Sequence, residues 1–225
     1  GRILLTLYNV TGQVKYYKAA SLLREQLKSH PRTKEGGFWH KKRYPNQMWL
    51  DGLYMGEPFY AQYTTTFENG KQLDDVAKQF ELIQKHATDP KTGLLYHAWD
   101  ESKLMAWANK EDGKSPNFWS RSIGWYAMAL VDALDYFPKN HPKRKELIGY
   151  LNSLAVALDK AKDEKYGLWY QVTDQGNREG NYLESSGSSM FIYALAKGVN
   201  KGYLPAKYKV IASNSFNSLT SLLIK

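Results

Sequence analysis

The hydrophobic positions of this chain follow a helical period over most of its length. Apolar residues recur at spacings of three and four, as on the buried face of an α-helix. This spacing predicts helices at about residues 14–29, 47–67, 71–86, 118–136, 143–161, 185–199 and 205–223, with a further helical pattern over 3–8. The alternation that is typical of β-strands is nearly absent. The pattern therefore predicts an all-α fold.

Two kinds of helix alternate along the chain. Segments 47–67, 118–136 and 185–199 are apolar or small nearly all round, as in the run from Trp125 to Leu130, which is typical of buried helices. The segment after each of them carries lysine and glutamate on one face, as expected of a helix that borders solvent. We therefore predict one domain, residues 1–225, built from hairpins of an inner and an outer helix.

A weak internal repeat supports this organisation. The three long connections each contain a glycine followed by bulky residues, at 37–40, 93–97 and 167–171. Each connection leads into an inner helix, and the starts of these helices align so that Asp51, Arg121 and Glu184 occupy matching places. Repeated hairpins with long loops at one end predict a toroid whose loops and inner-helix N-termini share one mouth. We expect the site there, because free N–H groups at helix N-termini face a ligand.

The composition is that of an ordinary globular protein. Hydrophobic residues make up 43% and charged residues 24%, and no apolar run approaches the roughly 20 residues of a membrane span, so no membrane association is predicted. The 31 Lys and Arg against 22 Asp and Glu give a net charge of +9. These basic residues are spread over segments such as 139–145 and 160–165, which favours solvated helix ends over a nucleic-acid-binding stripe. Because the chain has no cysteine, disulfides and thiolate metal sites are excluded.

Aromatic residues are the first candidates for ligand binding. The chain has seven Trp and 17 Tyr, and most of the tryptophans fall in the predicted loops. Flat aromatic faces suit sugars, because they cover the apolar face of a pyranose ring. Trp49 and Trp119 stand beside charged residues at helix starts, which favours a site. Trp125 lies inside a predicted helix and fits a buried core position equally well.

Polar residues at the predicted mouth supply candidate chemistry. Asp51 is either a helix N-cap or a general acid whose carboxyl is flanked by indoles. His40 and His97 occupy matching places in the repeat and could bind a sugar carboxylate or exchange protons. Arg121 offers a forked donor for a carboxylate, or forms a surface salt bridge. A metal site is not predicted, because the helical His pair of HExxH is absent and no cysteine is available.

Taken together, these residues resemble the unsaturated rhamnogalacturonyl hydrolases of glycoside hydrolase family 105. The resemblance rests on four strings, 37–41 (GFWHK), 47–55 (QMWLDGLYM), 96–100 (YHAWD) and 118–125 (FWSRSIGW), and it extends over the whole chain. It implies an (α/α)6 barrel. It also implies that Asp51 protonates C4 of a 4,5-unsaturated uronic acid at the end of an oligosaccharide, that water adds at C5, and that the hemiketal opens to release the sugar.

The resemblance also implies the residues of the uronate-binding subsite. These are His40, Lys41, Trp49, His97, Trp119, Arg121 and Trp125, with no covalent nucleophile, metal or cofactor. Two alternatives remain open at this point: an unsaturated glucuronyl hydrolase acting on glycosaminoglycan fragments, and an inactive carbohydrate-binding homologue. About four hairpins are predicted here against six in the family barrel, so we expect flanking hairpins at both ends to be missing. The oligomeric state is not predicted.

Overall fold

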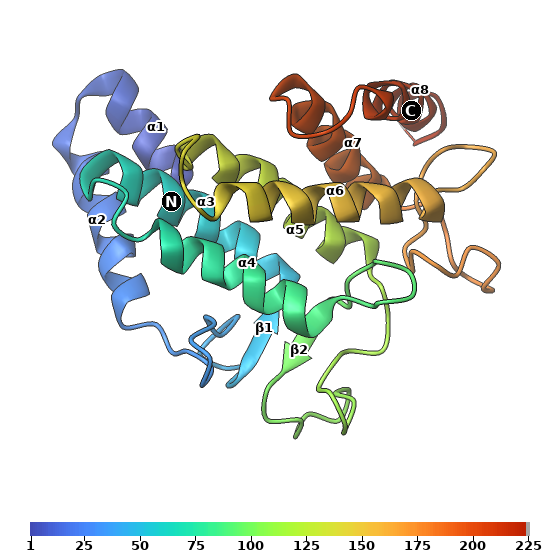
Figure 1. The fold of residues 1–225 in the computed structure, drawn as a ribbon, viewed down its shortest axis with the longest axis horizontal. Helices are drawn as coiled ribbons and strands as arrows, with labels where there is room; N and C mark the ends of the chain where they lie inside the picture. The colour runs from blue at the N-terminus through green and yellow to red at the C-terminus, as the bar shows by residue number, and fades with distance from the viewer. Residues whose placement is uncertain (224–225) are drawn as a thin grey trace.

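The computed structural model describes residues 1–223, and the prediction of an all-α fold is confirmed (Figure 1). Its α-helices are α1 (Arg2–Thr11), α2 (Val14–Lys28), α3 (Leu50–Phe67), α4 (Leu73–Ala87), α5 (Ser120–Ala133), α6 (Arg144–Ala161), α7 (Ser185–Asn200) and α8 (Lys207–Leu223). A 3₁₀ turn, η1 (Leu134–Tyr136), follows α5, and two short strands are β1 (Gln47–Trp49) and β2 (Ala98–Asp100). None of the described helices is both long and apolar enough to cross a membrane.

The helices alternate between an inner and an outer row, as the pattern predicted. Helices α1, α3, α5 and α7 pack on one another in that order, and each is followed by an outer helix. Figure 1 shows α4 and α6 in front of α3 and α5, with the long connections gathered along the lower and right-hand side. The short connections lie on the opposite side. The long loops and the N-termini of α3, α5 and α7 therefore meet at one end of the fold.

A large apolar core joins the two rows from α3 onward, and a smaller cluster packs α1 and α2 against α3. Phe80 of α4, Tyr126 and Leu130 of α5, and Phe191 of α7 are fully buried in the large core. Burying a side chain of this size stabilises the fold by about 1.5–3 kcal/mol. Trp169, from the connection before α7, is also fully buried and lies edge-on to Phe191 with 5.1 Å between the ring centroids. The core thus anchors a long connection as well as the helices.

The predicted helix 47–67 begins three residues later than expected, because residues 47–49 form a strand. β1 pairs antiparallel with β2, with Gln47 opposite Asp100. The backbone N–H of Leu50, the first residue of α3, donates to the carbonyl of His97 at 3.0 Å. In the same way, the N–H of Ser120 at the start of α5 donates to the carbonyl of Gln171 at 3.0 Å. In both cases the long loop that follows a helical hairpin bonds to the first residue of the inner helix of that hairpin. The helical period of the sequence does not reveal such a contact.

The turn glycine of the first repeat is Gly36 rather than the predicted Gly37. Gly36 has φ +96°, and its counterparts Gly93 and Gly167 have φ +75° and +65°, a conformation that favours glycine. Gly37 is needed for a different reason. A Cβ at Gly37 would lie 2.2 Å from the Sδ of Met48. The repeat is therefore confirmed, but in its first copy the turn glycine stands one residue earlier than predicted.

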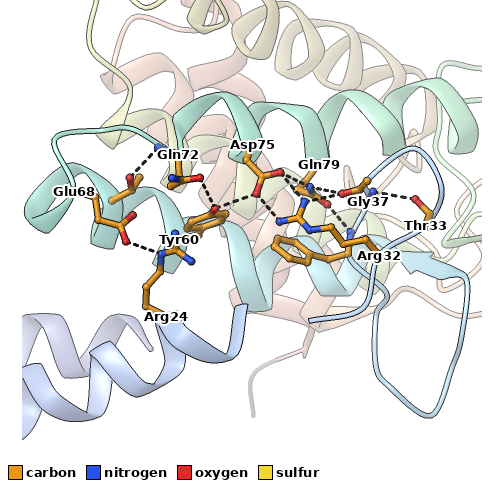
Figure 2. Close-up of polar contacts among 12 residues, drawn as sticks. Arg24, Arg32, Thr33, Gly37, Tyr60, Glu68, Gln72, Asp75 and Gln79 are labelled. Carbon is orange, nitrogen blue, oxygen red and sulfur yellow. Dashed lines mark hydrogen bonds and ion pairs between the residues drawn. The ribbon is translucent and has the colours of Figure 1, made fainter. Parts of the chain in front are cut away.

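A paired polar network fixes this first turn against α4, and we call it the Arg32–Asp75 network (Figure 2). The Arg32 guanidinium donates to both carboxylate oxygens of Asp75 at 2.7 Å and lies over the ring of Phe38, with Cζ 3.9 Å from its centroid. The Gln79 amide donates to the Gly36 carbonyl at 3.2 Å and accepts from the Phe38 N–H at 2.7 Å. The turn that leads to His40 is therefore tied to α4 by side chains.

The network continues into α3 and α2. Tyr60 of α3 donates to Asp75 at 3.0 Å, and the Arg24 guanidinium of α2 lies over the Tyr60 ring, with Cζ 4.7 Å from its centroid. Arg24 also donates to Glu68 at 2.9 Å. Burial acts to raise the pKa of Asp75, but hydrogen bonds from Arg32, Tyr60 and Gln79 outweigh it and lower that pKa.

Candidate active site

The carboxylate of Asp51 lies where the predicted mouth opens, on the first turn of α3. Asp51 is the second helical residue; the N-cap is Trp49, and no side chain among residues 1–223 caps this helix. The interpretation of Asp51 as an N-cap is therefore wrong. Instead, its Oδ2 accepts a hydrogen bond of 2.5 Å from the hydroxyl of Ser122, a buried residue on the first turn of α5. The carboxylate is thus held between two inner helices.

Two histidines at matching places in the repeat lie close enough to this carboxylate for its charge to act on both rings. Burial is the main cause that lowers the pKa of His40 to about 4, with a smaller contribution from Lys41, while the charge of Asp51 opposes it. Burial also lowers the pKa of His97, again against the charge of Asp51. Both imidazoles are therefore neutral at neutral pH, so they can exchange hydrogen bonds with a ligand but do not act as fixed cations.

Glycine at position 52 lets His40 approach α3. A Cβ at Gly52 would lie 3.1 Å from Nδ1 of His40, closer than most side chains tolerate. Gly52 directly follows Asp51, so this close approach brings the His40 ring to the same helical turn. The approach of His40 to the first turn of α3 thus depends on a missing side chain.

Aromatic rings form a wall next to the two histidines. Trp49 stacks on His40, with ring centroids 4.6 Å apart and planes 5° apart, and on Tyr44 at 5.4 Å and 6°. His97 stands edge-on to Trp49 at 5.7 Å and to Trp119 at 6.0 Å. The structure therefore brings together four of the predicted residues. It adds Tyr44, which the sequence analysis missed.

Arg121 lies on the same helical turn as Ser122 and keeps part of its guanidinium free. Its Cζ lies 5.5 Å from the centroid of the Trp119 ring, and its Nη2 donates to Glu184 at 3.2 Å. The Arg121 side chain is 41% exposed, whereas Glu184 is 4% exposed. The pairing predicted as an alternative is thus present. The Nε of Arg121, in contrast, is buried without a partner among residues 1–223.

Glu184 is not the counterpart of Asp51 and Arg121, contrary to the alignment of the three helix starts. It is the N-cap of α7, and its side chain accepts a hydrogen bond from the N–H of Gly187. Asp51 and Arg121 are instead the second residues of their helices. The difference arises because α7 begins two residues later in its repeat than the aligned sequences suggest.

The last two predicted residues lie at the edges of this region. Trp125, one turn beyond Arg121, is half-buried and packs on Tyr54 of α3, with ring centroids 4.7 Å apart, so it is not a fully buried core residue. Lys41 is exposed, and its ammonium lies 5.8 Å from the centroid of the Tyr44 ring. Their roles toward a ligand stay predictions.

Cavity volume alone does not point to this face. A hollow of about 500 Å³ lies between residues 91–94 and 157–177 and contains none of the predicted residues. A hollow of about 170 Å³ lies behind His40 and Trp49. No cluster of three His, Asp or Glu side chains within residues 1–223 is placed to hold a metal ion. We identify the site from its converging polar and aromatic groups, not from its volume.

Comparison with known proteins shows the family of this chain. The model of the family described as Glycosyl Hydrolase Family 88 matches residues 1–224. The chain belongs to glycosyl hydrolase family 88. Protein Atu3128 of Agrobacterium fabrum is 38% identical over 170 residues, which cover 75% of this chain and 72% of that protein.

Two further matches confirm the resemblance seen in the sequence. The unsaturated rhamnogalacturonyl hydrolase YesR of Bacillus subtilis is 31% identical over 92% of this chain and 58% of its own length. A solved glycoside hydrolase from family 105 of C. acetobutylicum superposes with a TM-score of 0.97 at 53% identity, covering 98% of this chain and 61% of that one. This chain therefore spans about three fifths of the length of these two proteins. The expectation of flanking hairpins stays a prediction.

Proposed function

We propose that this chain carries the uronate-binding and proton-donating part of an unsaturated rhamnogalacturonyl hydrolase. The observation that carries the proposal is the Asp51 carboxylate, held by Ser122 and flanked by two neutral imidazoles. The guanidinium of Arg121 and the indole of Trp119 lie on the adjoining helix start. Membership of family 88 and the similarity to YesR support it.

In the proposed reaction Asp51 is the general acid. It donates its proton to C4 of the 4,5-unsaturated uronic acid, water adds at C5 and returns a proton to the Asp51 carboxylate, and the hemiketal opens to release the neighbouring sugar. Ser122 keeps the carboxyl oriented through its hydrogen bond to Oδ2. A positioned acid of this kind typically accelerates a reaction by about 10²–10⁴.

The other residues of the site bind the substrate in this proposal. Arg121 pairs with the uronate carboxylate through its exposed N–H groups, because a guanidinium matches a carboxylate in shape. Trp119 and Trp49 cover the apolar face of the sugar. His40 and His97, both neutral, exchange hydrogen bonds with its hydroxyl groups.

Similarity also favours rhamnogalacturonan products over glycosaminoglycan products. Identity is 31% to YesR and 26% to an unsaturated 3S-rhamnoglycuronyl hydrolase of Alteromonas. It falls to 16% for the solved unsaturated glucuronyl hydrolase specific for heparin, a level that supports the fold alone. We therefore propose unsaturated galacturonyl-rhamnose oligosaccharides as the substrate class.

The test is to incubate the chain separately with lyase-generated disaccharides of rhamnogalacturonan and of chondroitin. Hydration removes the conjugated double bond, so we expect its ultraviolet absorbance to fall with the first disaccharide and to persist with the second. An equal fall with both would overturn the substrate class. Binding of the rhamnogalacturonan disaccharide by calorimetry, with no fall in absorbance, would indicate a carbohydrate-binding protein.

A further inference from the structure

A hollow lies beside α3, and we call it the Glu57 chamber. It has a volume of about 170 Å³, is lined by residues of α2, α3, α4 and the segment 38–49, and opens to solvent beside the exposed Met55. Its lining includes Trp39, His40, Gly52, Glu57 and Gln79. The chamber thus adjoins the back of the His40 ring, while the Asp51 carboxylate lies on the α5 side.

Three polar atoms of residues that line this chamber have no partner among residues 1–223. They are Nε1 of Trp39, Nδ1 of His40 and Oε2 of Glu57, and all three are buried. Leaving a buried polar group unpaired costs about 1–3 kcal/mol. Three such groups around one hollow therefore point to a polar occupant that satisfies them together.

Glu57 is the most unusual of the three, because its side chain is 2% exposed and has no cation of its own. The nearest positive charge, Arg32, is already held by both carboxylate oxygens of Asp75. Burial raises the pKa of Glu57 well above its usual value, and the charge of Asp75 adds to this more than Arg32 offsets it. A neutral carboxyl group here offers one O–H donor and one carbonyl acceptor to the chamber.

Gln79 does not supply the missing partner. Its amide is already engaged by the Gly36 carbonyl, the Phe38 N–H and Asp75. The hollow is also far larger than the roughly 10–15 Å³ that one water molecule needs, and a buried water typically makes about three hydrogen bonds. Water molecules fit both the volume and the mixture of donors and acceptors.

We infer that the Glu57 chamber binds a small cluster of water molecules that joins the Glu57 carboxyl to the His40 imidazole and the Trp39 indole. Glu57 is thereby a positioning residue for His40. A water that contacts Nδ1 of His40 fixes the tautomer of the ring, and so decides which atom the ring presents at the Asp51 face. The catalytic part of this inference rests on the proposed function, whereas the chamber and its effect on His40 do not.

The inference is tested first without any substrate. Long-range ¹H–¹⁵N spectra report the tautomer of each histidine ring, and His40→Gln assigns the His40 signal. Glu57→Leu removes the polar group at similar volume, so we expect the His40 ring signals to move and its single tautomer to be lost. Glu57→Gln keeps a donor and an acceptor, so it should leave the His40 signals nearly unchanged.

Glu68→Gln is the matched control, because Glu68 caps the C-terminal end of the same helix, pairs with Arg24 and does not line the chamber. His40 signals that are identical in Glu57→Leu and Glu68→Gln would overturn the inference. If Glu57→Leu does not fold, a high-resolution crystal structure of the unchanged protein decides: ordered waters bonded to Glu57 and His40 support it, and a dry chamber overturns it.

The effect on catalysis is measured separately. With an active chain, Glu57→Leu should lower kcat and leave KM nearly unchanged, and Glu57→Gln should restore kcat. A loss of kcat that Glu57→Gln shares in full would assign Glu57 a role other than positioning. If the unchanged chain shows no turnover, the proposed function fails while the histidine spectra still decide the chamber.

Discussion

Two polar clusters flank α3, and they differ in how completely their buried atoms are paired. In the Arg32–Asp75 network, a guanidinium, a carboxylate and the Gln79 amide satisfy one another (Figure 2). At the mouth, Nδ1 of His97 and Nε1 of Trp119 are buried without a partner among residues 1–223. Paired groups stabilise a fold, whereas unpaired groups cost stability and are retained where a ligand supplies the partner.

This contrast separates structural from functional residues more sharply than residue type does. Asp51 and Asp75 are both carboxylates close to inner helix α3, and each accepts hydrogen bonds from a neighbouring element. The account predicts that changing Asp75 costs stability and that changing Asp51 costs turnover.

The largest expected effect is on turnover in Asp51→Asn. The amide keeps the size of the side chain but carries no acidic proton, so kcat should fall by about 10²–10⁴ while the melting temperature and the affinity for the disaccharide stay nearly unchanged. Asp74→Asn is the control, because that side chain is 80% exposed on the first turn of α4. Turnover by folded Asp51→Asn at the rate of the control would remove Asp51 from the mechanism.

The next largest effect is on stability in Asp75→Ala. This change leaves the partly buried Arg32 guanidinium without its carboxylate, so we expect the free energy of unfolding in urea to fall by about 3 kcal/mol. Glu25→Ala breaks the exposed pair with Lys28 and should cost less than about 1 kcal/mol. Equal losses of unfolding free energy in the two variants would show that the Arg32–Asp75 pair stabilises the fold no more than an exposed pair does.

Acid should destabilise the folded chain through His40. The pKa of His40 is lowered to about 4 in the fold, so the unfolded chain binds the proton first and stability is lost as the pH falls from the ordinary histidine value toward 4. The lowered pKa of His40 corresponds to at most about 3 kcal/mol of unfolding free energy, and solvent screening reduces this contribution to roughly 2 kcal/mol. Urea unfolding between these pH values should show a weaker acid dependence in His40→Asn, and an identical dependence would contradict this assignment.

The smallest effect is on substrate affinity in Arg121→Lys. Lysine keeps the charge but not the planar fork, so the disaccharide should bind about tenfold more weakly, equivalent to ~1.4 kcal/mol. Glu184 complicates this change because it also pairs with Arg121, and Arg121→Ala measured beside it shows the full loss. Calorimetric affinities that are unchanged in both variants would assign Arg121 to the pairing with Glu184 alone.

The helices and their order were predictable because apolar spacing reports which face of a helix is buried. The neighbourhood of Asp51, His40 and His97 was predictable because the repeat places the two histidines at equivalent turns. The strand at 47–49 was not, since these three residues continue directly into the helical pattern and their pairing depends on residues 98–100.

Contacts between segments that are distant in the sequence could not be predicted for a similar reason. Ser122 donates to a residue 71 positions away, and Arg32 pairs with one 43 positions away. Serine and arginine occur widely on protein surfaces, so neither residue type marks such a contact in advance. Glu57 stood within an apolar helical pattern, but only the fold shows that no cation reaches it.

The most direct test of the central claim is turnover of the rhamnogalacturonan disaccharide in heavy water, followed by NMR at early times. The account predicts that the first product carries a deuteron at C4, has lost the double bond, and does not form with Asp51→Asn. Release of a sugar whose double bond is intact, or formation of the same product at the same rate by Asp51→Asn, would contradict it.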